Sequence, residues 1–429
     1  MLCAISAGGG IGGGGLLLPM LILLLAFTPH DASPLTNATV LGGAVANLAY
    51  YVKQRHPSGR RPIISYEVAL MMEPMTMAGA LAGVLLNKVF PGWLITSLLV
   101  IVLGITTRRT LKKGMETWQK ESAAAALTVA HPEAATSLLS PADKALAASP
   151  CVYTCASAAA TLAASSAPLG SSALPAESAA SAQLARIAEE EKDYPRRDVG
   201  MLVVALAACT LISVLRGPNR QQSPLQLHCG SLGYWGSILL QLVLLLGVSI
   251  STRSILMSRH ERRKACGYPF LPDDVQWTSS SSILYPLACA VAGLCAGLFG
   301  IGGGIVKGPL MLEMGMLPQV ASATSAFMIF FTAASATIQY AMLGDLRPTY
   351  ACVLFVAGLL GTALGQRVVG VLLRKSGRQS LIVLIIAFII GTSTIIMAVT
   401  GVLNVIAEVN EGKHQGFRPL CESTLVGDL

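Results

Sequence analysis

Long apolar stretches separated by short polar or basic segments dominate the pattern of residues along the chain. A helix that crosses a membrane needs about 20 mainly apolar residues. Stretches near that length predict helices at roughly 1–27, 35–52, 66–87, 92–107, 200–215, 232–252, 283–315, 319–342, 348–373 and 379–405. The pattern therefore predicts an all-α fold, a polytopic transmembrane helical bundle.

Two of these stretches, 1–27 and 283–315, contain a cluster of glycines followed by a proline. Irregular backbone at membrane depth is tolerated only where it is buried in protein or lines a wet cavity. We therefore expect two broken, Gly-rich helices inside the bundle.

Residues 120–198 differ from the rest of the chain because they are rich in Ala, Ser and Pro and end in a charged run. Such composition is typical of a flexible linker. The predicted organisation is a first transmembrane repeat at 1–119, the linker at 120–198, two connecting spans with a basic loop at 199–282, a second repeat at 283–407 and a short tail at 408–429.

Composition supports a membrane protein, because 53% of the 429 residues are hydrophobic and only 12% are charged. Soluble domains carry roughly 25% charged residues, so a water-soluble enzyme is disfavoured. The net charge of +8 comes from basic clusters between apolar stretches, which indicates membrane topology and not nucleic-acid binding. Lys and Arg are in excess on the face of the linker, which predicts that the linker is cytoplasmic. The basic cluster at 374–378 falls on the opposite face when the predicted spans are counted, so it contradicts this assignment of the linker.

The two glycine clusters align without gaps. Gly10–Gly14 matches Gly300–Gly304, and Pro19 matches Pro309. An internal repeat of this kind predicts two homologous halves, as in transporters that bind their substrate at the repeat interface. By the count of spans, the two copies run the same way across the membrane. An additional span hidden in the linker would make them inverted.

Glycine lacks a Cβ atom, so the backbone can bend there and a solute can approach it closely. A break followed by proline predicts a half-helix whose proline lies in an early turn and whose free N–H groups face a cavity. Such an end attracts anions. Close packing of helices through small residues is the structural alternative. The candidate substrate-binding residues are Gly10, Gly12, Gly13, Gly14, Pro19, Thr36, Asn37, Gly300, Gly302, Gly303, Gly304, Lys307, Pro309, Ser322, Thr324 and Ser325.

Two charged residues fall inside predicted spans. Lys307 either attracts an anion or extends its ammonium group to the membrane surface from a short helix end. Glu73 is a candidate for a coupling proton, and a hydrogen-bonded structural role is the alternative.

The segments GIGGGGLLLPML and GLFGIGGGIVKGPLMLEMG, with YYVKQRHPSGRRPIISYEVALMMEPMTMAG between them, resemble the sulfite exporter TauE/SafE family, especially its plant-like branch. The resemblance covers the chain except about 121–190. It implies a membrane permease for sulfite, organosulfonates or related anions. Three features depart from the pattern: the half-helix expected before the first glycines is missing, Lys307 replaces an apolar residue, and Glu73 replaces a Gln. The first departure reflects either a truncated gene model or an altered repeat.

The leading functional hypothesis is therefore a secondary transporter. It would bind a small anion between two Gly-rich half-helix ends and move it across the membrane by alternating access. A non-transporting receptor or assembly scaffold of the same fold is the alternative. We find no motif of an intramembrane enzyme, no metal-ligand cluster and no cofactor signature. The expected partners are the anionic substrate and the lipid bilayer, not nucleic acid. Homo-oligomerisation, and the choice between plasma membrane and endomembrane, stay open.

Overall fold

The computed structural model describes residues 14–25, 27–56, 59, 61–130, 187, 195–217, 230–268, 270, 274–376, 379–410 and 416–417. These residues are almost entirely helical, and an isolated bridge between Arg55 and Pro62 is their only strand-like pairing. The prediction of an all-α fold is confirmed. The helices are α2 (Gly14–Leu25), α3 (Pro29–Tyr51), α4 (Tyr66–Val89), α5 (Gly92–Ala130), α10 (Arg196–Arg216), α11 (Leu232–Ala265), α12 (Ser281–Phe299), α13 (Gly304–Glu313), α14 (Pro318–Met342), α15 (Pro348–Ser376) and α16 (Gln379–Asn410).

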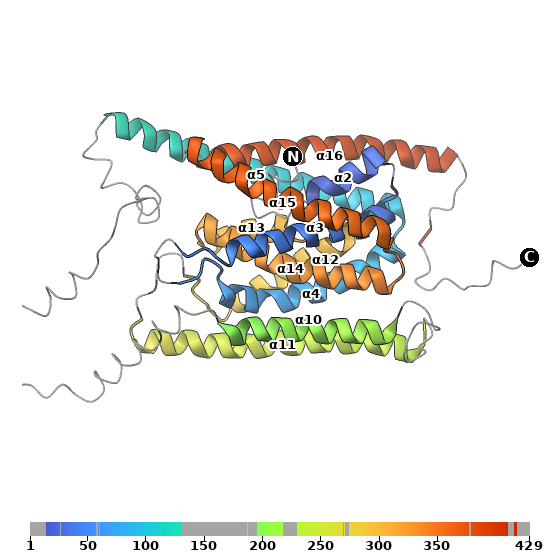
Figure 1. Ribbon diagram of the computed structural model, residues 1–429, viewed down its shortest axis with the longest axis horizontal. Helices are drawn as coiled ribbons and strands as arrows, with labels where there is room; N and C mark the ends of the chain where they lie inside the picture. Colours follow the sequence, from blue (N-terminus) through green and yellow to red (C-terminus); the bar gives the residue numbers. More distant parts are fainter. Residues whose placement is uncertain are drawn as a thin grey trace, which may run out of the picture.

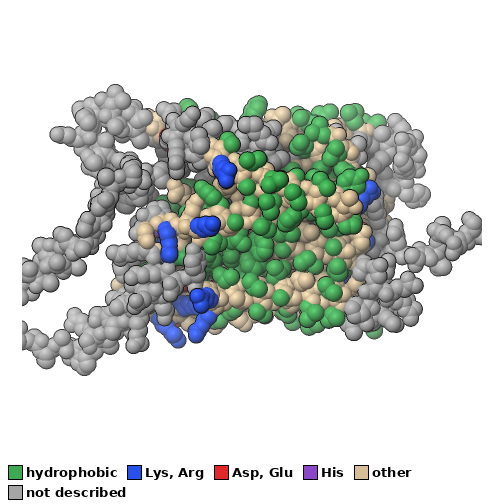
Figure 2. Space-filling model, viewed as in Figure 1, with side chains coloured by type: hydrophobic (Ala, Val, Ile, Leu, Met, Phe, Trp, Pro, Cys, Tyr) green, Lys and Arg blue, Asp and Glu red, His purple; other side chains and the backbone are tan. Residues whose placement is uncertain are grey.

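Seven of the helices in the described residues are long and apolar enough to cross a membrane: α4, α5, α10, α11, α12, α14 and α15. Figure 2 shows the corresponding surface, in which apolar side chains cover the middle of the molecule and most of the visible Lys and Arg gather at one end. The chain is therefore a multi-pass integral membrane protein. The predicted linker begins later than expected, because α5 continues to Ala130, and residues 131–186 lie outside the described part.

The helices form layers, with α3, α4, α12 and α14 between the α10–α11 pair on one edge and α5 and α16 on the other (Figure 1). Glycines allow α4 and α12 to pack closely. A Cβ atom at Gly79 would lie 2.0 Å from the carbonyl oxygen of Ala290, and one at Gly293 would lie 2.0 Å from that of Thr76. Small-residue packing is thus used between these two helices. The same packing, which was the structural alternative for the glycine clusters, occurs at the cluster residue Gly300, where a Cβ atom would lie 2.3 Å from the carbonyl oxygen of Ser33.

Contacts at the helix ends fix the direction of each helix. The hydroxyl groups of Tyr51 and Ser322 are 3.3 Å apart, so the end of α3 lies beside the start of α14. At the other end of the molecule Lys88 pairs with Asp345, which places the end of α4 beside the residues that follow α14. Helix α3 is therefore antiparallel to both α4 and α14. We call the end where α4, α10 and α14 begin the basic face.

Helices α12 and α13 form a hairpin that enters the bundle and returns to the same face. Trp277, just before α12, and Met316, just after α13, both line one cavity at the basic face. From the basic face α12 runs parallel to α4. Near the ends of these two helices the Asn87 amide donates a hydrogen bond to the Leu298 carbonyl. The prediction that 283–315 crosses the membrane once is wrong, because the glycine break reverses the chain.

This hairpin changes the predicted topology. The helices after the two motifs, α3 and α14, run in opposite directions, so the prediction that the two copies run the same way is wrong. Helix α15 is parallel to α3: Asp31 pairs with Arg347 near their starts, and Asn47 bonds to Gln366 near their ends. Helix α15 therefore ends at the basic face. The basic cluster at 374–378, where α15 ends, therefore no longer contradicts the excess of Lys and Arg on that face.

Candidate functional site at the helix break

The break between α12 and α13 is built from three glycines with left-handed backbone. Gly300, Gly302 and Gly303 have φ angles of 72°, 68° and 71°, which side chains with a Cβ atom rarely adopt. The break is also tightly surrounded, since a Cβ atom at Gly302 would lie 2.6 Å from the Val40 side chain. Val40 lies about halfway along α3. Gly300 packs instead against Ser33, nearer the start of α3, so the break lies inside the bundle between the start and the middle of α3.

Helix α13 begins at this depth without a cap from any side chain. Gly303 is its N-cap residue and makes no side-chain hydrogen bond there. The first N–H groups of a helix have no acceptor within that helix, so those of Gly304 and Ile305 point out of α13 at the break. The positive end of the helix dipole lies at the same place.

The described end of the first glycine motif, which begins at Gly14, packs against this break. Gly14, at the start of α2, packs so closely on Ile301 that a Cβ atom would lie 2.5 Å from the Ile301 Cα atom. Pro19 is buried in the same helix. The candidate residues Gly10, Gly12 and Gly13 lie outside the described residues. The structure thus brings the second motif and the end of the first one together.

The prolines of the two motifs lie deeper in their helices than expected. Pro309 is the sixth residue of α13, and Pro19 lies inside α2. The prediction that the proline occupies an early turn is wrong for α13 by about one turn. At its actual position Pro309 cannot donate to the carbonyl of Ile305, which leaves that carbonyl without its helical hydrogen bond.

Asn37 is an unusual residue on the helix that packs against the break. The residues of α3 that touch the break are Ser33, Thr36 and Val40, and Asn37 shares their face. Its side chain is fully buried, and neither the nitrogen nor the oxygen of its amide has a hydrogen-bond partner. Buried polar groups are normally hydrogen-bonded. The Thr36 hydroxyl, in contrast, donates to the carbonyl of Ala32 at 2.7 Å.

Lys307 and Glu73 form an ion pair in the interior of the bundle. The Lys307 Nζ atom is 3.0 Å from Glu73 Oε2 and donates to Thr332 Oγ1 at 2.7 Å, while the Thr332 hydroxyl lies 2.6 Å from Glu73 Oε1. Both charged side chains have no exposed surface. Lys307 therefore does not extend to the membrane surface, which excludes that one of its two alternatives. The pair joins α4 to α13 and α14.

The other polar candidates do not gather at the break. The hydroxyl of Ser322 contacts Tyr51, and that of Thr324 accepts a hydrogen bond from the Ser65 backbone N–H at 3.0 Å. Ser325 is fully buried beside them in α14. Because α3 and α14 are antiparallel, these residues lie toward the basic face, whereas Thr36 and Asn37 lie toward the opposite one. The structure therefore places these two groups of candidate residues at different depths of the bundle.

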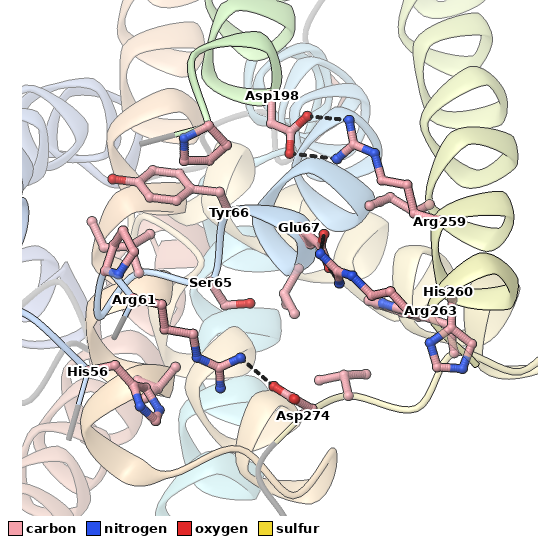
Figure 3. Close-up of a pocket in the computed structure, with 18 of the residues that line it drawn as sticks. His56, Arg61, Ser65, Tyr66, Glu67, Asp198, Arg259, His260, Arg263 and Asp274 are labelled. Carbon is pink, nitrogen blue, oxygen red and sulfur yellow. Dashed lines mark hydrogen bonds and ion pairs between the residues drawn. The ribbon is translucent and has the colours of Figure 1, made fainter. Parts of the chain in front are cut away.

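A cavity of about 1000 Å³ opens at the basic face, close to this polar part of α14. Figure 3 shows how Arg61, Arg259 and Arg263 point toward carboxylates around it. Arg61 pairs with Asp274 at 2.6 Å, Arg259 holds both oxygens of Asp198, and Arg263 holds Glu67 at 2.9 Å. The lining includes twice as many arginines as carboxylates, since it also contains Arg196, Arg197 and Arg262. The cavity therefore has a positive excess.

Sequence reasoning missed this cavity and interpreted its basic residues as topology signals alone. The arginines come from three separate segments: the loop before α4, the start of α10 and the end of α11. A signal was present, because each of three basic clusters has an acidic residue nearby, namely Glu67, Asp198 and Asp274. The three segments meet only in the folded molecule.

A bundle of membrane-crossing helices, with a broken hairpin in its interior and a charged cavity open at one face, defines a polytopic membrane transporter. Comparison with known proteins agrees with this class. The family model described as Sulfite exporter TauE/SafE matches residues 2–176 and 196–393. The chain belongs to the sulfite exporter TauE/SafE family.

Curated relatives from Arabidopsis thaliana are similar over almost the whole chain. The chain is 30% identical to Sulfite exporter TauE/SafE family protein 3, over 98% of this chain and 80% of that protein. It is 30% identical to family protein 5, over 97% of this chain and 84% of that protein. No solved structure matches the chain significantly.

Proposed function

We propose that this transporter moves small anions, specifically sulfite, organosulfonates or related sulfur oxyanions, by alternating access at the helix break. The observation that carries the proposal is the buried, unpartnered amide of Asn37 beside the break. An amide left without partners in the interior costs free energy. A substrate with several acceptor oxygens would accept hydrogen bonds from it and from the free N–H groups of α13.

The cavity at the basic face supplies the approach to this site. Its excess of arginines attracts anions electrostatically and raises their local concentration. Its lining includes Val320 of α14 and Ser65, whose backbone N–H donates to Thr324, so the cavity borders the first turn of α14. We propose that anions enter here and that movement of one half of the bundle against the other exposes the break in turn to each face.

Glu73 has a role in this proposal as the site of proton coupling. While Glu73 is ionised, its carboxylate holds the Lys307 ammonium at 3.0 Å. Protonation of Glu73 removes the negative charge and leaves Lys307 to attract the substrate. Binding of the anion and binding of a proton would thus favour each other. Cys289 is the other titratable group next to the pair, and it is fully buried on α12.

The proposal is tested by flux into liposomes that contain the purified full-length chain. We expect saturable uptake of sulfite or of an organosulfonate from a broad panel of anions. A full-length, folded protein that moves none of them would contradict the proposal. If such a protein also captured a stable partner, the receptor or scaffold alternative would be favoured.

Proton coupling has its own test. Methanesulfonate is a suitable probe because its own charge does not change over the pH range used. We expect its uptake to rise as the external pH falls. The double variant Glu73→Gln, Lys307→Leu should transport it with little dependence on pH. A wild-type pH profile in that double variant would contradict the assignment of Glu73.

A further inference from the structure

Arg216, the last residue of α10, is buried at the end of the bundle opposite the basic face. Only 1% of its surface is exposed, and it is among the largest fully buried side chains of the described residues. A charged group away from water is costly in a membrane protein unless another group compensates it. The groups around the Arg216 guanidinium therefore indicate which kind of group compensates its charge.

The guanidinium group has few protein partners. Its Nη2 atom donates to Gln339 Oε1 at 2.8 Å, whereas Nε and Nη1 have no hydrogen-bond partner. The Tyr234 ring lies under the group, with its centroid 5.3 Å from Cζ. A ring stabilises a cation partly but accepts no strong hydrogen bond. Most of the donors of Arg216 are thus left unused.

The polar residues around Arg216 are incompletely satisfied as well. Gln339 donates to Ser213 at 2.9 Å, and Gln241 donates to Ser213 and to the carbonyl of Cys209. The Gln241 Oε1 atom has no partner. A network with unused donors and an unused acceptor in the interior indicates that another polar group belongs there.

No carboxylate of the described residues neutralises Arg216. Asp345, at the same end of the molecule, pairs with Lys88 at 3.3 Å. Arg216 forms no ion pair with an Asp or Glu side chain in the described parts of the chain. The local charge at this end is therefore positive.

We infer that Arg216 is the centre of an oxyanion site between α10, α11 and α14. Its ligand carries a sulfo or phosphate group whose oxygens accept hydrogen bonds from Nε and Nη1. The source of that group is either a free ion or the headgroup of a phospholipid, because α10 and α11 lie at one outer edge of the bundle (Figure 1) and expose apolar side chains there.

This site is separate from the helix break and does not rest on the proposed transport function. Gln339 lies seven residues after Thr332 along α14, or about 10 Å. Thr332 belongs to the Lys307–Glu73 network, whereas Gln339 contacts Arg216. Binding can therefore be measured in protein that carries no flux.

The test is the effect of sulfate on the thermal unfolding of the purified full-length chain, at constant ionic strength against chloride. We expect sulfate to raise the unfolding temperature of the wild type by more than that of Arg216→Gln, because any binding of sulfate at the helix break would contribute equally to both proteins. Arg347→Gln is the matched control, because Arg347 lies at the same end and its side chain is 58% exposed. It should respond like the wild type. An equal response in Arg216→Gln, together with no difference between the two proteins in anionic lipid, would overturn the inference.

A second arm identifies the source of the group. Wild type and Arg216→Gln are compared in nanodiscs of phosphatidylcholine alone and of phosphatidylcholine with phosphatidylglycerol. Stabilisation of the wild type alone by phosphatidylglycerol, with sulfate stabilising the wild type and Arg216→Gln equally, assigns the site to a lipid headgroup. If neither sulfate nor the anionic lipid distinguishes the two proteins, the inference is wrong.

Two measurements keep the test decisive if Arg216→Gln does not fold. Arg216→Lys keeps the charge but loses the forked donors, so it should bind sulfate, or the anionic lipid if that is the source, at least tenfold more weakly than the wild type. Where sulfate stabilises the wild type and phosphatidylglycerol does not, a crystal grown with selenate should also show an anomalous peak within hydrogen-bonding distance of Arg216. Wild-type affinity in Arg216→Lys, or no peak at a stabilising selenate concentration, would overturn the inference.

Discussion

Two single residues that depart from the family pattern turn out to contact each other. Lys307 and Glu73 are 234 positions apart in the chain, yet their charged atoms are 3.0 Å apart in the bundle. A charge introduced alone at either position would be buried without compensation. Each charge is compensated only because the other one is present.

The energetics of this pair can be measured with a double-mutant cycle. Removing one member of a buried ion pair costs about 3–5 kcal/mol, because the other charge stays behind. We expect Glu73→Gln and Lys307→Leu each to destabilise the protein by about that amount. The double variant should recover most of the loss. Additive losses in denaturant unfolding of the three variants would contradict a functional ion pair.

At this scale the sequence identified the important residues but not their relation. Lys307 and Glu73 were noticeable because charge is rare in apolar stretches. Their contact depends on α13 folding back beside α4, which no local pattern encodes. Asn37 was predicted as a donor, but only the structure shows that its amide has no partner.

The helix break is the element on which the site depends. The run of glycines after α12 predicted a break correctly, because few other residues adopt left-handed backbone three times within four positions. The reversal of the chain at the break was not predictable. A span of 283–315 is long enough to cross once with a kink or to enter and return, and apolar composition is the same in both cases.

A pair of glycine substitutions in the same region tests this element. Gly302→Val forces a branched side chain into left-handed backbone, at a cost of about 1–3 kcal/mol, and also into Val40. We expect transport to be abolished and some folded protein to remain. Gly308→Ala is the control within α13, because a Cβ atom there meets nothing within 4 Å. Normal transport by Gly302→Val would contradict the role of the break.

For the whole molecule, the direction of the helices is the main difference between expectation and structure. The approximate positions of the helices could be predicted, since each of the ten predicted stretches overlaps a helix of the described residues. The number of crossings was not predicted, because seven of the described helices, not ten, are long and apolar enough to span a membrane. Their direction followed from counting crossings, and one hairpin counted as a crossing reverses everything after it. The basic cluster at 374–378 signalled this error, since it disagreed with the other basic segments.

Cysteine labelling in sealed vesicles tests the topology directly, in a chain whose native cysteines are replaced by alanine. The hairpin places Ser280 and Glu313, which flank it and are exposed, on the same face. Cysteines at these positions should react with an impermeant maleimide from the same side. A cysteine at Arg347 should react from the other side. Labelling of Ser280→Cys and Glu313→Cys from opposite sides would contradict the hairpin and support a single membrane crossing by residues 283–315.

The central claim is that the break beside Asn37 holds the transported anion. Asn37→Leu tests it most directly, because leucine has a similar size and removes the unpartnered amide. The decisive measurement is uptake of labelled sulfite into liposomes by this variant and by the wild type, with stability measured in parallel. The account predicts a variant that is at least as stable as the wild type but takes up sulfite at least about tenfold more slowly. Equal uptake by the two proteins would contradict it.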